Sequence, residues 1–281
     1  VQPLCCGLSA GDASPAAVSL WGRRTARDRW LWGADHSHIY QGDLHMSDFS
    51  RRNVVRGVAW TGTDWVAIGD GGTIVRSSDG VSFSAVTSGT TQSLWSILKQ
   101  GTTFYAVGDG GTIASSADLM TWSVGTSINA QKLNAIAGNG SRVVAVGDSG
   151  TIEYSADGIT WLPSTVPSNM NANLYGVSYL SSGAWLAVGA GGTLLSSPDG
   201  VTWTALTSGV TTDLRAVAYR AASTVTTTLP VAATVTTAAS FVVVGAGGVV
   251  LSSTDGVTWI SQPSSVTADL LSVTSLPNQF L

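Results

Sequence analysis

Apolar and polar positions change along this chain in short runs, and one kind of run recurs. These runs are apolar at almost every position and end in glycine; they lie at Trp65–Ile68, Phe104–Val107, Val143–Val146, Trp185–Val188 and Phe241–Val244. A short run without a polar face is typical of a strand covered on both sides. No segment joins a capping box to a 3.6-residue apolar period, so the pattern predicts strands and no helix.

Each apolar run belongs to a longer unit with a fixed order of features. A glycine-rich tight turn follows the run, then a second strand, and a further strand closes the unit. A leucine-led strand precedes the run, at Leu94–Ile97, Leu133–Ile136, Leu174–Val177 and Leu214–Val217. The glycines that end the runs are 39, 39, 42 and 56 residues apart. Four strands in about 40 residues is the size of a propeller blade, so we expect an all-β β-propeller.

The beginning of the chain resembles a degenerate, or worn, copy of this unit. Residues 1–16 contain Pro, Gly, Ser and Ala without a period, and we expect them to form an arm. Residues 17–50 keep the order of the unit in weakened form, with strands expected at Ala17–Trp21, Trp30–Gly33 and Ile39–Tyr40. Terminal repeats are commonly atypical because they close or cap a stack, so the propeller is expected to span 17–281.

The end of the chain supplies a strand that this worn copy lacks. Leu270–Val273 matches the leucine-led strand, and Gln279–Leu281 matches the start of the next run. Two chain ends that share a blade would close the ring and remove both sheet edges. With five clean units this gives six blades, or seven if the ends occupy separate blades. The inserted stretch 221–239 reads either as a protruding β-hairpin, which its valines and threonines favour, or as a Thr/Ala-rich loop.

Composition narrows the range of partners. The formal net charge is −4 and charged residues make up 11% of the chain, so neither nucleic acid nor insertion into a membrane is expected. Seven of the eleven arginines lie within 23–56, which confines any basic patch to that region. No run approaches the roughly 18 apolar residues that span a bilayer. The only cysteines, Cys5 and Cys6, are neighbours, which excludes a disulfide framework and a cysteine zinc site. No cofactor is expected.

The end of each unit carries a motif that resembles the Asp-box, or BNR, repeat. Copies lie at Ser77–Phe83, Tyr154–Trp161, Ser197–Trp203 and Ser253–Trp259, and Ser116–Trp122 departs by replacing glycine with Leu-Met. The resemblance covers about residues 57–260 and implies a β-propeller. It implies little about activity, because the box occurs in sialidases, other glycosidases, photosystem II assembly factors and many surface proteins. The complete sequence of the repeat is most similar to repeats of bacterial extracellular proteins and of phage tail or fibre proteins.

Physical chemistry gives this box a structural role. An aspartate at a hairpin accepts hydrogen bonds from nearby backbone N–H groups, and glycine supplies the positive φ. The aromatic residue, expected in the fourth strand, covers the turn by packing between blades. A calcium loop would need several carboxylates, and each of these loops has one. The residues expected to be structural are Asp79, Asp118, Asp157, Asp199, Asp255, Trp122, Trp161, Trp203 and Trp259.

Few residues suit catalysis. A sialidase resemblance would imply an arginine triad and a Tyr–Glu pair, but the only glutamate is Glu153 and the later arginines are scattered. A glycosidase needs two carboxylates about 5–10 Å apart. Asp70, Asp109 and Asp148 lie at equivalent turns, so they are the candidates for such a pair, against the alternative of hydrophilic turn residues. The histidine cluster within 36–45 is expected to be a polar cap and not a metal site.

One position inside the repeat varies while its frame does not. The residue after the leading residue of strand one should lie near the mouth of the central channel, and it is Arg56, Trp95, Asn134, Tyr175, Arg215 and Leu271 in turn. We hypothesise that this ring binds a glycan or a peptide. Trp95 and Tyr175 would stack on the ligand and the arginines would donate hydrogen bonds to it. Asp70, Asp109 and Asp148 are expected on the same face and complete the candidate set. The alternative is that assorted side chains plug the channel.

These features favour a non-enzymatic propeller exposed on a surface. It would be a phage tail or virion component or a secreted adhesin module, extracellular or on a virion, and it would recognise glycan or protein. The N-terminal arm would attach it to other proteins of a larger assembly. Two other classes stay open: a glycan-active hydrolase with a sialidase-like fold, and an assembly factor resembling the photosystem II group. The first would need a reactive carboxylate pair, and the second a basic patch across several blades.

Overall fold

The computed structural model is built from strands and tight turns. It describes residues 54–180, 183–220, 222–227, 233–237 and 240–275 and, before them, strands β1 (Val18–Ser19), β2 (Trp30–Trp32) and β3 (His38–Tyr40). Within these residues the helices are 3-10 turns of three residues each, and none has the length or apolar character needed to cross a membrane. The expectation of an all-β chain is confirmed.

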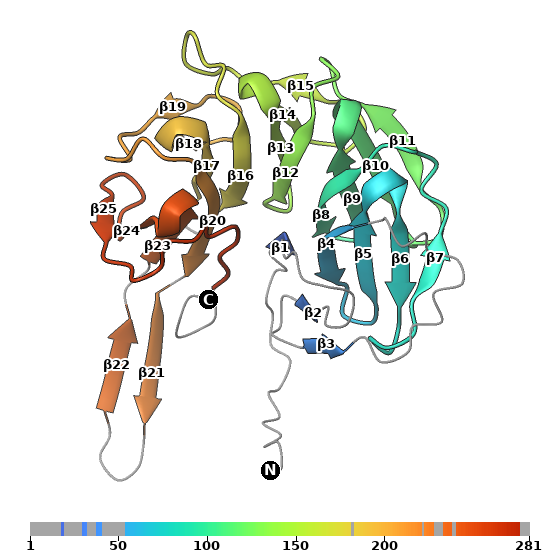
Figure 1. Cartoon of the computed structure of the whole chain (residues 1–281), viewed down its shortest axis with the longest axis horizontal. Coiled ribbons are helices and arrows are strands. Elements are labelled where there is room, and N and C mark those ends of the chain that lie inside the picture. The colour runs from blue at the N-terminus through green and yellow to red at the C-terminus, as the bar shows by residue number, and fades with distance from the viewer. Residues whose placement is uncertain are drawn as a thin grey trace.

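Five antiparallel sheets, here called blades 1 to 5, follow one another around an arch (Figure 1). Each contains four strands paired in chain order, and the first sheet has β1 (Val18–Ser19) as a fifth strand. Blade 1 consists of β4 (Val55–Trp60), β5 (Trp65–Gly69), β6 (Ile74–Ser77) and β7 (Ser84–Val86). Blade 2 consists of β8 (Leu94–Gln100), β9 (Thr103–Gly108), β10 (Thr112–Ser116) and β11 (Ser123–Thr126). Blade 3 consists of β12 (Leu133–Gly138), β13 (Val143–Gly147), β14 (Ile152–Ser155) and β15 (Leu162–Pro163).

The remaining two blades keep the same plan. Blade 4 consists of β16 (Leu174–Tyr179), β17 (Trp185–Gly189), β18 (Leu194–Ser197) and β19 (Thr204–Ala205). Blade 5 consists of β20 (Leu214–Arg220), β23 (Ser240–Gly245), β24 (Val250–Ser253) and β25 (Ile260–Gln262). The first strands of successive blades contact one another, from β4 through β8, β12 and β16 to β20, so these strands line the inside of the arch.

The core lies between blades. Every residue of β5, β13 and β17 is buried, as the unbroken apolar runs predicted. Alternate residues of one strand serve two neighbours, because successive side chains of a strand point to opposite faces. In blade 3, Val143 and Ala145 pack against blade 2, whereas Val144 and Val146 pack against blade 4. Each second strand is therefore covered on both sides and cannot carry a polar face.

The Asp boxes stabilise the turns that join the third and fourth strands of the blades. In blade 4, Asp199 Oδ1 accepts the N–H groups of Val201 and Thr202 at 2.8 and 2.9 Å and the Ser197 hydroxyl at 2.9 Å. These bonds, first that from the Thr202 N–H, hold the pKa of Asp199 below its ordinary value. The buried Trp203 packs against blade 3. It precedes β19, so the prediction that the fourth strand includes the aromatic residue is wrong: the box turn extends up to it.

The opposite face carries the tight turns that join strands two and three. These turns are η1 (Asp70–Gly72), η2 (Asp109–Gly111), η3 (Asp148–Gly150), η4 (Ala190–Gly192) and η5 (Ala246–Gly248). Each packs under the link that leads to the next blade. At Gly72, where φ is +73°, a Cβ would lie 2.0 Å from the Thr90 carbonyl oxygen, so only glycine fits. Turns and links thus share one face.

The chain ends differ from expectation. β1 pairs with β4 as an additional strand of blade 1, with Val18 opposite Val58, and does not begin a separate blade. β2 pairs with β3, as the worn unit predicted. Leu270–Val273 has no strand structure, and the segment 279–281 that was expected to continue the unit lies outside the described residues. The described blades number five, not six.

Within 221–239, β21 (Ser223–Thr227) pairs with β22 (Ala233–Thr237) in an antiparallel two-stranded ribbon that extends away from blade 5 (Figure 1). The expected arm at 1–16 and the side chains of the histidine cluster at 36–45 lie outside the described residues.

Candidate functional site

Each ring position that varies between repeats sits at an irregularity in the first strand of its blade. In β8 the register shifts between Leu94 and Ser96, and β4, β12, β16 and β20 shift at the same place. The skipped residues are Arg56, Trp95, Asn134, Tyr175 and Arg215, here called the channel-mouth ring. A bulge re-aims the side chain of its extra residue. All five side chains are half-buried. The register shift therefore distinguishes this position from its neighbours in the backbone as well as in the sequence.

In blades 1 to 3 the first residue of the tight turn is an aspartate that bonds the ring residue of its own blade. The pairs are Arg56 Nε–Asp70 Oδ1 at 2.5 Å, Trp95 Nε1–Asp109 Oδ1 at 2.7 Å and Asn134 Nδ2–Asp148 Oδ1 at 2.8 Å. Each carboxylate therefore holds a ring side chain in place. This engagement argues against the carboxylate pair that a glycosidase would need.

Blades 4 and 5 lack these turn carboxylates. Their turns begin with Ala190 and Ala246. Arg215 pairs instead with Asp213, Nη2 to Oδ2 at 3.0 Å, and its guanidinium lies 4.3 Å from the centre of the Tyr175 ring. The buried Nε of Arg215 has no hydrogen-bond partner among the described residues. Blades 4 and 5 therefore present polar groups that the fold itself does not fully use.

Trp95 does not offer a stacking face to a ligand, contrary to our expectation. The Arg56 guanidinium lies 3.7 Å from the centre of the indole and Lys132 Nζ lies 3.5 Å from it. Two cations so close to one ring centre must lie on opposite faces, because one face has room for only one. Each contact is a cation–π interaction. A sugar ring would have to displace one of these cations to stack on Trp95.

Lys132 joins the ring electrostatically. It is half-buried, and burial is the main reason that the pKa of its ammonium lies below the ordinary lysine value. The carboxylates of Asp148 and Asp109 oppose this shift, and the charge of Arg56 adds to it. Within the described part of the chain Lys132 forms no ion pair shorter than 4.0 Å. The two carboxylates therefore act on its charge through space, without a direct ion pair.

Lys132 and Asp213 were missed by the sequence comparison. Both precede the leucine that leads strand one, a position held in turn by Val54, Ser93, Lys132, Asn173, Asp213 and Asp269. That position also varies while its frame is constant, so the same comparison applied one residue earlier in blades 2 to 5 would have found them. Leu271, the sixth predicted member, is half-buried in a segment without strand structure.

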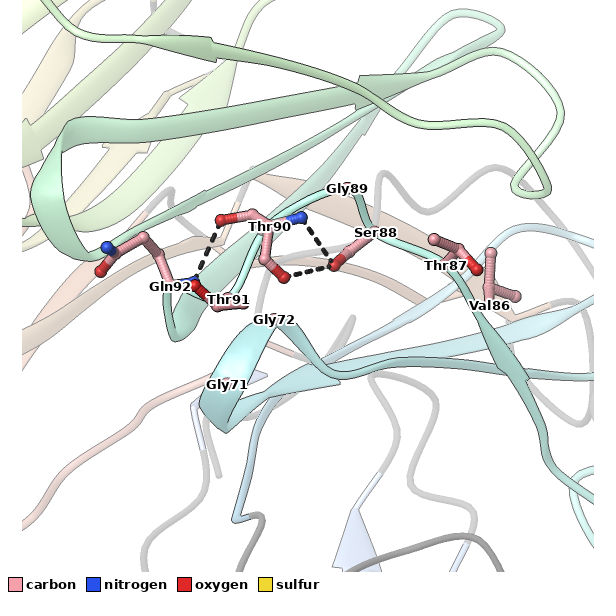
Figure 2. A pocket seen from close by; sticks show the side chains of 9 residues that line it. All are labelled: Gly71, Gly72, Val86, Thr87, Ser88, Gly89, Thr90, Thr91 and Gln92. Carbon is pink, nitrogen blue, oxygen red and sulfur yellow. Dashed lines mark hydrogen bonds between the residues drawn. The ribbon is translucent and has the colours of Figure 1, made fainter.

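Two other candidate regions lie apart from the ring residues. An open hollow between η1 and the link 86–92 is lined by glycine, threonine, Ser88, Val86 and Gln92 and includes no ring residue (Figure 2). Glu153 is only 1% exposed between blades 2 and 3, and burial raises its pKa. The Ser127 hydroxyl and the Ile128 N–H oppose that shift, although neither has hydrogen-bond geometry to the carboxylate. Neither region offers the carboxylate pair of a glycosidase.

Among the described residues, no three His, Cys, Asp or Glu side chains gather closely enough to hold a metal ion. The mouth instead combines guanidinium, ammonium, carboxylate, amide and phenol groups. This mixture suits binding of a ligand with both hydrogen-bond donors and acceptors.

No family model and no curated protein sequence matches the chain. Solved structures do. "YCF48 bound to D1 peptide" matches with a TM-score of 0.64 and 18% identity over 89% of this chain and 83% of that one. "YCF48 from Cyanidioschyzon merolae" matches with a TM-score of 0.48 and 15% identity over 77% and 87% of the two chains.

An ancestral GH74 enzyme matches with a TM-score of 0.58 and 12% identity over 80% of this chain and 33% of the enzyme. This chain therefore spans about a third of that protein. Identities this low show the fold alone. YCF48 and the GH74 enzyme are both β-propellers, so the chain has a propeller fold.

Proposed function

We propose that this protein is a non-catalytic propeller that binds an extended segment of a partner protein across the channel-mouth ring. The observation that carries the proposal is the bulge in the first strand of every described blade, which sets five side chains of four residue types into a uniform frame. A position used only for packing would keep one residue type. Variation at a place that the backbone singles out is what recognition of an irregular ligand requires.

A peptide suits this mouth better than a glycan. Glycan recognition commonly uses an open aromatic face, and both faces of Trp95 are covered by cations. A peptide main chain offers carbonyl acceptors to Arg215 and N–H donors to side-chain oxygens. The solved structure of YCF48 bound to a D1 peptide is a precedent for a propeller with a bound peptide.

A selection of random peptides displayed with free C-termini tests this function. We expect the wild-type protein to enrich peptides that the Trp95→Ala/Arg215→Ala double variant binds at least about tenfold more weakly, since truncating a hot-spot residue costs about 2 kcal/mol or more. The control is Val81→Ala/Val257→Ala, two exposed positions on the box face. Peptides that bind the double variant and wild type equally would refute the proposal.

The second candidate function, a glycan-active hydrolase, is favoured by the likeness to the GH74 enzyme fold. Chromogenic glycosides and polysaccharides test it. Cleavage that is abolished by Asp109→Ala would establish the hydrolase and displace the binding role. Binding to a glycan array that is lost in the double variant would assign the ring to glycans instead of peptides.

We also propose that a sixth blade closes the ring, with Leu270–Val273 in the place of its first strand. Asp269 Oδ1 accepts the N–H of Gly247 at 2.9 Å, the same link that Asp213 makes to Gly191 at 3.0 Å. The chain after blade 5 therefore follows the path of the earlier links. Deleting residues 270–281 should lower the melting temperature; an unchanged melting temperature would contradict closure.

The setting is also a proposal: part of a larger extracellular or virion-surface assembly, to which residues 1–16 attach. It rests on the scarcity of lysine, with Lys99 and Lys132 the only two, and on the many serine and threonine residues. Light scattering of the protein from its native source is the test. A particle much larger than 28.7 kDa that dissociates when residues 1–16 are removed supports it, and a monomer contradicts it.

A further inference from the structure

The links between blades follow a rule that one link breaks. In blades 2 to 5 the residue before the leading leucine uses its carbonyl to accept the N–H of the first turn residue in its own blade. Its side-chain oxygen reaches back and accepts the N–H of the second turn residue in the preceding blade. These bonds are Asn173 Oδ1–Ser149 N at 2.9 Å, Asp213 Oδ1–Gly191 N at 3.0 Å, Asp269 Oδ1–Gly247 N at 2.9 Å and, at the limit of bonding, Ser93 Oγ–Gly71 N at 3.5 Å.

The exception is the link from blade 2 to blade 3. Here the residue is Lys132, whose ammonium has donors and no acceptor. Its carbonyl still accepts the Asp148 N–H at 2.9 Å, so the backbone keeps the pattern and only the side chain departs from it. In the described part of the chain no protein group accepts the N–H of the exposed residue Gly110, which holds the position that Gly191 and Gly247 hold in blades 4 and 5.

The side chain of Lys132 lies instead against the ring. Its ammonium is 3.5 Å from the centre of the Trp95 indole. The nearby carboxylates are engaged elsewhere: Asp109 accepts the Trp95 N–H at 2.7 Å and Asp148 accepts the Asn134 amide at 2.8 Å. Neither approaches Lys132 within 4.0 Å. A half-buried cation and an N–H without an acceptor thus belong to one link.

We propose that Lys132 and the Gly110 N–H bind a carboxylate of the ligand. One ligand oxygen would take the position that Asn173, Asp213 and Asp269 oxygens take in other links. Carboxylate is the group in two of these three links, and charge-assisted bonds to an ammonium favour it over a neutral carbonyl. This inference rests on the proposed function, because it specifies one group of the bound segment. Both a peptide C-terminus and an acidic side chain present this chemistry.

Small probes test the site without the full ligand. Backbone amide shifts of the whole chain are followed by NMR during titration with N-acetyl-alanine, with N-acetyl-alaninamide and with the α-amide of N-acetyl-aspartate. The variant is Lys132→Asn, which places at this link the residue type found at Asn173, so the chain caps its own turn. The matched control is Lys99→Asn, because Lys99 is the only other lysine and its Nζ bonds the Thr61 carbonyl outside the ring.

We expect N-acetyl-alanine or the aspartate probe to shift the Gly110 amide, and the neutral alaninamide to leave it unmoved. Lys132→Asn should weaken that binding at least about tenfold, as loss of a charge-assisted hydrogen bond predicts. Lys99→Asn should bind like wild type. Which carboxylate binds more tightly identifies a C-terminus or an acidic side chain as the source.

The inference is wrong if the neutral probe shifts Gly110 as strongly as the carboxylates, or if Lys132→Asn responds like wild type. Its failure is separate from that of the proposed function. Selected peptides that need Trp95 and Arg215 but bind Lys132→Asn normally would leave a peptide site without this carboxylate contact. Carboxylate binding at Gly110 with no ring-dependent peptide would leave the anion site and remove the peptide-binding role.

Discussion

A carboxylate added to the turn of blade 5 should block the part of the ligand site that this blade contributes. In blade 1 the turn residue Asp70 bonds Arg56, Oδ1 to Nε at 2.5 Å. Blade 5 has the same ring residue type, Arg215, but its turn begins with Ala246. Ala246→Asp therefore copies the blade 1 arrangement at a turn position that already holds aspartate in three blades. The new carboxylate should occupy donors of Arg215 that we assign to the ligand.

The size of the effect follows from the exposure of the two arginines. The Arg56 side chain is 17% exposed and that of Arg215 is 28% exposed, so the copied pair is somewhat better solvated than its template. A hydrogen bond to a charged group contributes about 1.5–3 kcal/mol, and partial exposure places the blade 5 pair at the lower end. We expect the peptide Kd to rise about tenfold, which corresponds to about 1.4 kcal/mol.

Fluorescence anisotropy with a selected peptide measures this change. The control is Val257→Asp, which adds the same charge to blade 5 at an exposed position on the box face. Equal weakening by both variants would show a general charge effect. Normal binding by Ala246→Asp, with a melting temperature like that of wild type, would refute the role of Arg215.

Three further predictions concern the frame. Backbone N–H groups of the box, first that of Ser82, lower the pKa of Asp79 from 3.8 to about 2. The stability that its ionised form contributes is therefore present above pH 3.8 and lost as the pH falls through about 2. Urea midpoints that stay constant over this pH range would contradict the prediction. Gly192→Ala should destabilise the protein more than Gly191→Ala, because the new Cβ at 192 would lie 2.0 Å from a carbonyl oxygen. A Cβ at 191 meets nothing within 4 Å and carries only the cost of positive φ, about 1–2 kcal/mol. Equal losses of unfolding free energy in urea titrations would exclude the contact. Trp203→Ala should cost about 3–5 kcal/mol in denaturant unfolding, because Trp203 is 2% exposed, and a loss below that of Gly191→Ala would contradict its packing role.

The repeated frame could be predicted because each of its elements has a local cause. An unbroken apolar run such as Val143–Val146 requires cover on both faces, and only stacked sheets provide it at this spacing. The turn glycines mark where the backbone must approach a carbonyl closely. The position of the ring could be predicted for the same reason: Trp95 and Tyr175 each follow the leucine that leads strand one and precede a small residue.

The chemistry within the ring could not be predicted, because it depends on neighbours from other blades. Trp95 looked like an open aromatic face in the sequence. Its two covering cations come from blade 1 and from the link before blade 3. The pairing of β1 with β4 escaped prediction for a similar reason, since an edge strand accepts any segment with suitable backbone geometry. Repeat patterns describe what one unit needs and omit what adjacent units do to each other.

The difference between the turns divides the mouth into two parts with different roles. In blades 1 to 3, aspartates hold the ring side chains before any ligand arrives, which lowers the ordering cost of binding there. In blades 4 and 5, alanines leave Arg215 and Tyr175 to find partners elsewhere. A ligand anchored by a carboxylate at Lys132 would therefore first contact the ring side chains that the aspartates of blades 1 to 3 hold in place. The rest of its chain would cross toward blades 4 and 5, where selectivity among peptides should be decided.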